Sequence, residues 1–438
     1  MKYDLVIVGG GVAGTALFYT ISNYSDVERV LLLEKRPELG ALNSDSRSNS
    51  QTLHFGDIES NYTDEKAAET RNASSMVLNY LGGLHQEERS LLVHKCQKMV
   101  LAVGDEELRT LDDMEKRRRS IFPNLERLGV DRLRELEPAI VKERRSGERI
   151  AALSSPDGYM VDFGGLAKSF IKNSRRSHDL DVLLTSDVMN VRRDGGVYEI
   201  FTADKSYEAE SVVFSAGSYS LFFAKMMGYA TDTSILSVGG NFYHTPKVLN
   251  GKVYRIERGS IPFAAVHGDP DINFPDKTRF GPTVEVKPFL EKNNIFTLKD
   301  YVSTFGVGTE TLAALGKIVR KKDIFKIMAS NLAYSVPVVG KELFLVKEVQ
   351  KIVPSLKYSD LKKYRSGGGI RPQLVDLKMG RLILGEKRIE GPGIVFNVTP
   401  SPGATSCLRL AFQDAYKLSG FLGKNFYLDK FKEDVGSI

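Results

Sequence analysis

The first 35 residues constrain the fold more than any other part of the chain. The apolar run 4–8 is followed at once by glycines at positions 9, 11 and 14, spaced as G-x-G-x-x-G, and by a helical pattern over 15–22. A second apolar run, 30–33, ends on Glu34, twenty positions after the last glycine. This order of strand, turn, helix, strand and acidic residue is typical of a dinucleotide-binding βαβ unit.

Each part of this pattern has a physical reason. The first glycine permits a tight turn, the second lets the backbone approach a pyrophosphate, and the third lets the helix pack closely on the strand. The helix start offers unpaired N–H groups to phosphate, and the acid accepts hydrogen bonds from ribose. We therefore expect a cofactor to contact Gly9, Gly11, Val12, Ala13, Gly14, Glu34 and Lys35. The alternative is a glycine-rich turn with a structural role alone.

The motif by itself does not separate NAD from FAD, but two later segments favour FAD. The apolar run 211–215 ends in Ala-Gly, as does the late strand that passes the dinucleotide in two-domain flavoproteins. Small residues over 400–406 precede a helical pattern and would stabilise negative charge on a reduced flavin. These segments add Ala216, Gly217, Gly403, Ala404, Thr405 and Ser406 to the predicted cofactor residues. An ordinary core strand and a capped helix are the structural alternatives.

Composition excludes several other classes of protein. The chain has 438 residues, enough for two or three folding units, and a net charge of +6 that is too diffuse to indicate nucleic-acid binding. Its two cysteines, Cys96 and Cys407, form no CxxC pair, so we predict no metal site and a reducing compartment. The N-terminus lacks a cleavable signal, and no apolar stretch is long enough to span a bilayer. We expect a protein that is soluble or bound only at a membrane surface.

The polar stretch 48–63 resembles the malate:quinone oxidoreductase family, with its Asn-Ser-x-Thr-x-His and Asn-Tyr-Thr signatures. Further similar segments follow in order at 104–107, 265–271, 279–283, 370–373 and 399–407. The resemblance therefore covers nearly the whole chain. One departure is Gln51, where many members of the family have a small residue.

This resemblance implies a peripheral FAD enzyme of the citric-acid cycle. Such an enzyme oxidises (S)-malate to oxaloacetate and passes the electrons to membrane quinone at the cytoplasmic face of the inner membrane. It also implies that a loop runs past the flavin ring and contributes Asn49, Ser50, Gln51 and Thr52.

Oxidation of a 2-hydroxy acid needs a base for the hydroxyl proton, a hydride acceptor and cations for the carboxylates. His267 is the predicted base, with Asp269 to orient it, although it could simply be a turn histidine bonded to that carboxylate. His54 is expected to position the flavin or the substrate, or to be structural. Arg371, which lies between a glycine run and a proline, is the predicted carboxylate-binding cation, and Arg279 is assigned to the second carboxylate.

The expected architecture is α/β, with a Rossmann-like FAD-binding domain and an α+β substrate domain that contains an antiparallel sheet. The FAD-binding domain is expected to be discontinuous, over 1–80, 150–220 and 365–438. The substrate and membrane-facing domain takes 81–149 and 221–364, with a sheet over 237–286 and helices over 300–364. Basic and apolar residues alternate over 317–328 and form either a surface for anionic lipid or an ordinary solvated helix face.

Three other functions stay open from sequence alone. An L-2-hydroxyglutarate oxidase or dehydrogenase would need room for only one more methylene, and a pocket discriminates one methylene by about 1–3 kcal/mol. A non-catalytic FAD-binding protein would keep the fold without the chemistry. An NAD-dependent malate dehydrogenase would lack the late segment around Gly403.

Overall fold

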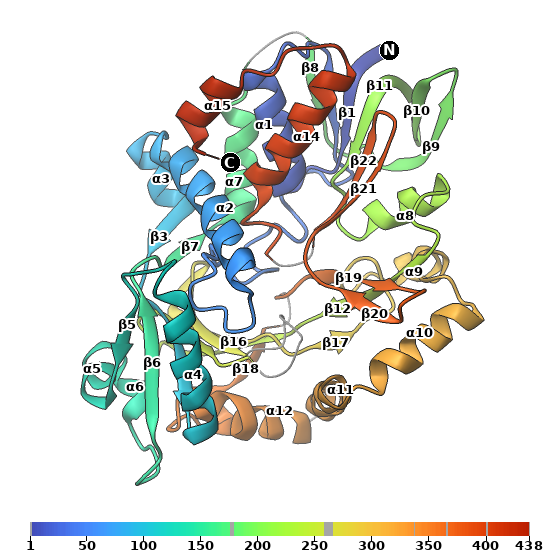
Figure 1. The fold of residues 1–438 in the computed structure, drawn as a ribbon. Coiled ribbons are helices and arrows are strands. Elements are labelled where there is room, and N and C mark those ends of the chain that lie inside the picture. Colours follow the sequence, from blue (N-terminus) through green and yellow to red (C-terminus); the bar gives the residue numbers. More distant parts are fainter. Residues whose placement is uncertain are drawn as a thin grey trace.

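A computed structural model describes residues 2–175, 179–257, 266–336, 338–364, 367–399 and 402–437. It confirms the predicted mixed α/β class: one large, mostly parallel sheet lies beneath the chain termini, and a second, mostly antiparallel sheet lies on the other side of the molecule (Figure 1). Residues 258–265, within the predicted sheet region, and residues 400–401 of the small-residue segment lie outside the described residues.

The first sheet is built around β1 (Lys2–Val8), which pairs in parallel with β2 (Val30–Leu33) on one side and with β11 (Ser206–Phe214) on the other. Strands β1 and β2 are buried on both faces, as the centre of a parallel sheet covered by helices requires. The main path runs β21 (Lys387–Gly391), β22 (Ile394–Val398), β11 (Ser206–Phe214), β1 (Lys2–Val8), β2 (Val30–Leu33) and β8 (Leu180–Leu183), with β9 (Val188–Asp194) and β10 (Val197–Thr202) extending from β11. The strand predicted at 211–217 is thus the direct neighbour of β1.

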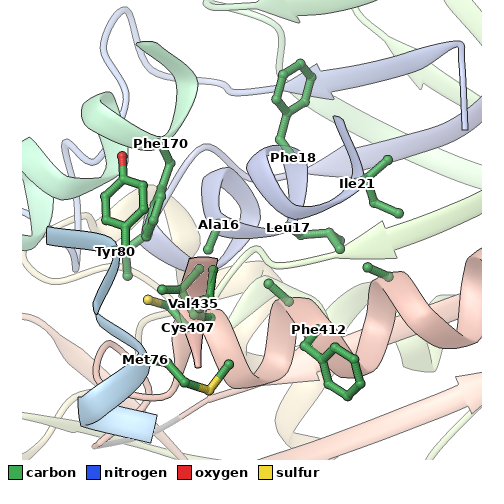
Figure 2. Packing of buried hydrophobic residues seen from close by; sticks show 14 of the residues in the cluster. Ala16, Leu17, Phe18, Ile21, Met76, Tyr80, Phe170, Cys407, Phe412 and Val435 are labelled. Carbon is green, nitrogen blue, oxygen red and sulfur yellow. The ribbon is translucent and has the colours of Figure 1, made fainter. Parts of the chain in front are cut away.

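Helices from both ends of the chain cover one face of this sheet. Figure 2 shows Leu17 and Ile21 of α1 facing the helix that carries Phe412. The ring of Phe170 lies 4.6 Å from that of Tyr80 in the same core. The helices that meet here are α1 (Val12–Tyr24), α2 (Asp64–Gly82), α7 (Phe163–Lys172), α14 (Cys407–Phe421) and α15 (Leu428–Val435).

The second sheet combines strands from three separate parts of the chain. In order these are β18 (Lys362–Tyr364), β13 (Phe242–Pro246), β16 (Phe274–Gly281), β15 (His267–Asp271), β14 (Lys252–Arg255), β4 (Lys98–Val103), β6 (Ile150–Ser155) and β5 (Glu126–Leu128). Near this sheet lie α4 (Asp105–Arg118), α5 (Val130–Leu136) and α6 (Pro138–Val141), while α3 (Gln86–Leu92) contacts α2 and α7 and is followed by the ribbon of β3 (Val93–Lys95) with β7 (Tyr159–Val161). The antiparallel sheet predicted over 237–286 therefore gains strands from 98–155.

A four-stranded sheet joins the two halves of the molecule. Its order is β17 (Glu285–Val286), β12 (Thr233–Gly239), β19 (Ile370–Asp376) and β20 (Arg381–Ile383). Because β6 belongs to the second sheet and β19 to this one, the expected domain pieces 150–220 and 365–438 each contribute to more than one sheet.

The helices predicted over 300–364 are present and lie along one margin of the molecule (Figure 1). They are α9 (Leu298–Phe305), α10 (Thr309–Val319), α11 (Lys322–Ser335), α12 (Val339–Phe344) and α13 (Gln350–Ile352), with a helical turn between the last two. The remaining helix, α8 (Tyr219–Met226), follows β11.

Gly9, at the end of β1, and Gly14, in the first turn of α1, allow a close approach of backbone segments. Gly9 has a φ of +111°, and a Cβ at this position would lie 2.5 Å from the carbonyl oxygen of Ser215. A Cβ on Gly14 would lie 2.0 Å from the carbonyl oxygen of Gly9. Helix α1 can therefore sit against the turn only while both positions lack a side chain.

We predict that Gly14→Ala lowers the free energy of unfolding by about 1–3 kcal/mol, because the added methyl overlaps backbone that cannot move aside. Gly316→Ala is the matched control, since Gly316 is exposed in α10 and its added methyl would meet nothing within 4 Å. That control should gain about 0.5–1 kcal/mol from helix propensity. Urea denaturation measures both, and equal effects at the two positions would contradict the packing argument.

Candidate active site

A large cavity opens at the carboxyl ends of β1, β2 and β11, with about 1540 Å³ of space including its mouth. This edge is the usual ligand site of a parallel sheet, because turns and helix N-termini converge on it. Fourteen of the predicted cofactor residues line the cavity: Gly9, Gly11, Val12, Ala13, Glu34, Lys35, Asn49, Ser50, Thr52, Ala216, Gly217, Gly403, Ala404 and Thr405. The other three, Gly14, Gln51 and Ser406, are not part of its wall.

The start of α1 presents backbone amides to the cavity. Gly11 precedes the helix without a side-chain cap, and the Val12 N–H donates to the Ser44 hydroxyl at 3.0 Å. The first-turn N–H groups and the partial positive charge of the helix suit a pyrophosphate at this point.

Glu34 lies at the end of β2 and is anchored by backbone. Its carboxylate accepts hydrogen bonds from the N–H groups of Gly10 at 2.6 Å and Arg36 at 2.7 Å. The next residue, Lys35, pairs with the buried Glu291, and its ammonium lies 4.3 Å from the ring centre of Tyr219. The two residues thus form a polar wall, in position for the hydroxyl groups of a ribose.

The cavity also contains residues that sequence reasoning did not identify. Asn43, Ser44 and Ser48 come from the loop after β2, and Gly369 comes from the approach to β19. The Asn43 side chain accepts a hydrogen bond from the Ile370 N–H at 3.2 Å, which ties the two segments together. The loop 43–48 contains no recognisable sequence motif, and the segment that it contacts lies over 300 residues away in the sequence. The glycine run 367–369 was therefore the only sequence feature that pointed to this part of the cavity.

Among the described residues, His54 is the one histidine in the cavity wall. Its Nδ1 lies 2.6 Å from a carboxylate oxygen of Glu59, and its backbone N–H donates to the Thr405 hydroxyl at 3.1 Å. Burial alone would raise the pKa of Glu59, but the hydrogen bond and charge of His54 outweigh it and lower the pKa to about 2. An ionised carboxylate only accepts hydrogen bonds, so Nδ1 of His54 is the donor to Glu59, and Nε2 is the ring nitrogen on the other side of the imidazole.

Arg371 also lines the cavity, at the start of β19. Among the described residues nothing forms a hydrogen bond or ion pair with its guanidinium, although Tyr254, Tyr62 and Glu257 lie close enough to interact with its charge. Burial and the negative charge of Glu59 raise the pKa of Glu257 to about 8. Glu257 is therefore mostly protonated at neutral pH and leaves the Arg371 charge uncompensated.

His267 and Arg279, the other two predicted substrate residues, lie behind this wall. His267 stacks on Tyr254 with ring centres 4.7 Å apart, and the Tyr254 hydroxyl contacts that of Thr52, which does line the cavity, at 2.7 Å. The Nδ1 of His267 is hydrogen-bonded to Asp269, as predicted for an orienting carboxylate. Burial lowers the pKa of His267, so its imidazole is neutral at physiological pH.

Asp269 is the centre of a fully buried charge cluster. Its second oxygen accepts from Arg279 at 2.9 Å and lies 3.8 Å from the Lys252 ammonium, which donates to the Ser50 carbonyl at 3.1 Å. Burial alone would raise the pKa of Asp269, but the charges of its basic neighbours hold it well below its usual range. The cluster therefore supports the Ser50 segment of the cavity wall from behind.

The side-chain amide of Gln51 holds the loop that contains Ser50 in place. It is fully buried with a φ of 55°. The amide nitrogen donates to the Ser46 carbonyl at 3.0 Å and to Asp271 at 3.1 Å, and the amide oxygen accepts from the Ile272 N–H at 3.1 Å. The residue at which this chain departs from the family pattern thus binds the loop to the end of β15.

The cavity therefore has two chemically different ends. One end offers amides and a carboxylate suited to a dinucleotide, and the other brings a carboxylate-oriented histidine near an unpaired arginine and the small residues 403–405. Such a site can hold an anionic substrate and accept its hydroxyl proton beside a redox cofactor.

Comparison with known proteins agrees with this description. A family model described as "FAD dependent oxidoreductase" matches residues 4–411. The L-alpha-glycerophosphate oxidase of Mycoplasma pneumoniae, solved with FAD bound, superposes with a TM-score of 0.62 at 18% identity over 96% of this chain and 95% of its own.

Two curated relatives differ in how similar they are. The malate:quinone oxidoreductase of Helicobacter pylori (strain ATCC 700392 / 26695) is 37% identical over 99% of this chain and 98% of its own length. The mitochondrial L-2-hydroxyglutarate dehydrogenase of Caenorhabditis briggsae is 26% identical over 94% of this chain and 92% of its own.

Proposed function

This chain belongs to the FAD dependent oxidoreductase family and, within it, to the malate:quinone oxidoreductases, and on that basis we propose that it oxidises (S)-malate to oxaloacetate and passes the electrons to quinone. In the reaction the C2 hydrogen leaves malate as hydride, the hydroxyl proton goes to a base, and two electrons finally reduce a quinone to quinol. The observation that carries this assignment is the unpaired Arg371 in the same cavity wall as His54, which Glu59 orients.

FAD fits the cavity, because the amides at the start of α1 and the wall at Glu34 suit its pyrophosphate and ribose. When bound, FAD supplies the hydride acceptor of the reaction. We assign its adenine-dinucleotide end to Gly9, Gly11 and Glu34, and its ring end to the segment 49–52 and to Gly403–Thr405.

Arg371 is assigned to a carboxylate of malate. A guanidinium stays charged even where burial lowers its pKa, and its planar donors match a carboxylate. Because Glu257 keeps its proton at neutral pH, it does not compete with the substrate for this charge. Binding of the carboxylate orients the C2–H bond of the substrate inside the cavity.

His54 is assigned to the hydroxyl proton. Glu59 fixes its Nδ1, so Nε2 is the available acceptor, and the ionised carboxylate stabilises the imidazolium that forms. His267, the base expected from sequence, is separated from the cavity by Tyr254. We assign His267 and Arg279 to the support of the wall, and keep direct proton transfer to His267 as the competing assignment.

Quinone is the proposed electron acceptor, so the enzyme has to work at a membrane. Within the described residues, each helix is too short or too polar to cross a bilayer. We propose peripheral attachment at the cytoplasmic face of the inner membrane.

The first test is the visible spectrum of the purified protein before and after anaerobic (S)-malate. We expect an oxidised-flavin band that bleaches with (S)-malate and keeps its intensity with (R)-malate, which serves as the stereochemical control. If L-2-hydroxyglutarate bleaches the band and malate does not, the activity is that of an L-2-hydroxyglutarate dehydrogenase. A flavin band that no hydroxy acid bleaches would indicate a non-catalytic FAD-binding protein.

We predict that His54→Gln slows malate-dependent flavin bleaching by about 10²–10⁴-fold, the usual contribution of a general base, while flavin content stays unchanged. His267→Gln is the matched variant and should slow bleaching by less than about tenfold if His267 acts only from behind the wall. Stopped-flow absorbance measures both rates. The reverse order of the two effects would assign the proton step to His267.

We predict that the KM for malate rises above pH 8, because ionised Glu257 then competes for the Arg371 charge. Folded Glu257 has its pKa raised to about 8, so the proton that favours malate binding is present below this pH and lost above it. The rise should approach about tenfold per pH unit and should disappear in Glu257→Gln. Steady-state kinetics from pH 6.5 to about 9.5 tests this, and a Glu257→Gln variant whose KM still rises would refute it.

A further inference from the structure

The exposed apolar side chains of this protein are concentrated in one region. Half of the large apolar side chains that the described structure exposes, thirteen of twenty-six, lie between Ile295 and Val346, which is about an eighth of the chain. Exposed apolar side chains that are concentrated in one region of a protein usually mark an interaction site.

Helix α11 shows the feature most clearly, because it has two apolar faces. Ile324 and Ile327 face inward, where they pack with Val238 of β12 and Val375 of β19. An adjacent face, exposed to solvent, carries Phe325, Met328 and Leu332, and Val336 follows directly after the helix; the four are spaced at about one helical turn and are exposed by 40–73%. A surface helix of a globular protein normally has one apolar face, toward the core, and polar residues on the faces toward solvent.

Neighbouring segments also expose large apolar side chains. Leu312 of α10 is exposed by 61%, and Val338 and Val339, between α11 and α12, by 70% and 57%. Figure 1 shows α9, α10, α11 and α12 in sequence along one margin of the molecule. We call the set Leu312, Phe325, Met328, Leu332, Val336, Val338 and Val339 the apolar margin.

Basic side chains accompany the apolar margin. Between positions 312 and 339 the chain has five basic residues and one acidic residue, Asp323. The five are Lys317, Arg320, Lys321, Lys322 and Lys326, all exposed, and within the described part of the chain none of them forms an ion pair. Unpaired lysines beside exposed apolar residues match the headgroup and acyl layers of an anionic bilayer.

We propose that the apolar margin is the surface with which the enzyme docks on anionic membranes: Phe325 and Leu332 of α11 enter the acyl boundary while Lys322 and Lys326 contact lipid phosphates. This inference rests on the proposed function, since a quinone substrate places the enzyme at a bilayer. Among the alternatives, a second copy of the chain would bring five unpaired positive charges against five more, whereas an anionic surface compensates them.

The test uses the purified full-length holoenzyme and lipid vesicles, with co-sedimentation as the readout. We expect binding to vesicles that contain phosphatidylglycerol and at least about tenfold weaker binding to pure phosphatidylcholine, with the difference reduced by salt. Lys322→Glu with Lys326→Glu should weaken binding by about 30-fold or more, because each basic residue near an anionic surface contributes about fivefold. Phe325→Ser with Leu332→Ser should also abolish most of it.

Matched controls carry the same changes at exposed positions elsewhere. Leu91→Ser with Met189→Ser, and Lys205→Glu with Lys387→Glu, should bind vesicles like the parent protein. Bleaching of the flavin by (S)-malate should be unchanged in all variants, so that failure of the membrane assignment is distinct from failure of the proposed chemistry.

Two outcomes would overturn the proposal. One is vesicle binding that the apolar-margin variants and the controls reduce equally. The other is a concentration-dependent dimer, detected by light scattering, that Phe325→Ser with Leu332→Ser dissociates while vesicle binding persists; the margin would then be a contact between two copies.

Discussion

The site depends on one close approach, between the end of β1 and the end of β11. Gly9 can reach the Ser215 carbonyl, and α1 can reach the Gly9 carbonyl, only because no Cβ stands between these backbones. This approach directs the amides of α1 and the segment 215–217 into the same cavity. The positions of Glu34, of the Asn43–Ser48 loop and of β19 then follow from contacts with this edge of the sheet.

A second constraint acts on the substrate end of the cavity. Asp269, Arg279 and Lys252 are fully buried, and each charge is acceptable there only because the others compensate it. The hydrogen bond from Lys252 to the Ser50 carbonyl connects this cluster with the cofactor loop, and Gln51 connects the same loop with β15. Rigid charge pairing behind the wall thus holds a polar loop that has little apolar packing of its own.

The parts predictable from sequence were those with a local physical signature. The glycine spacing and the apolar run 211–215 indicated β1, α1 and β11, because buried parallel strands and tight turns restrict residue type strongly. The pairing of β6 with β4, and the placement of Asn43 against Ile370, were not predictable, since contacts between distant segments leave no periodic pattern. The prediction of the catalytic base had the same limit. The sequence left only a few histidines as candidates, but only the fold shows that His54 lies in the cavity wall and that His267 lies behind Tyr254.

The first sheet is completed by strands and helices that are made last. Strand β22 pairs with β11, and α14 packs on α1. Residues 394–421 therefore complete a sheet and a helical layer whose first members, β1 and α1, lie at the N-terminus. A ribosome that adds about 5–20 residues per second needs about 20–80 s to make the intervening chain. Throughout that interval β1 and the apolar face of α1 lack their final partners, and the cofactor cavity lacks the wall at Gly403–Thr405. The complete cofactor cavity therefore exists only after the C-terminal part of the chain has been made.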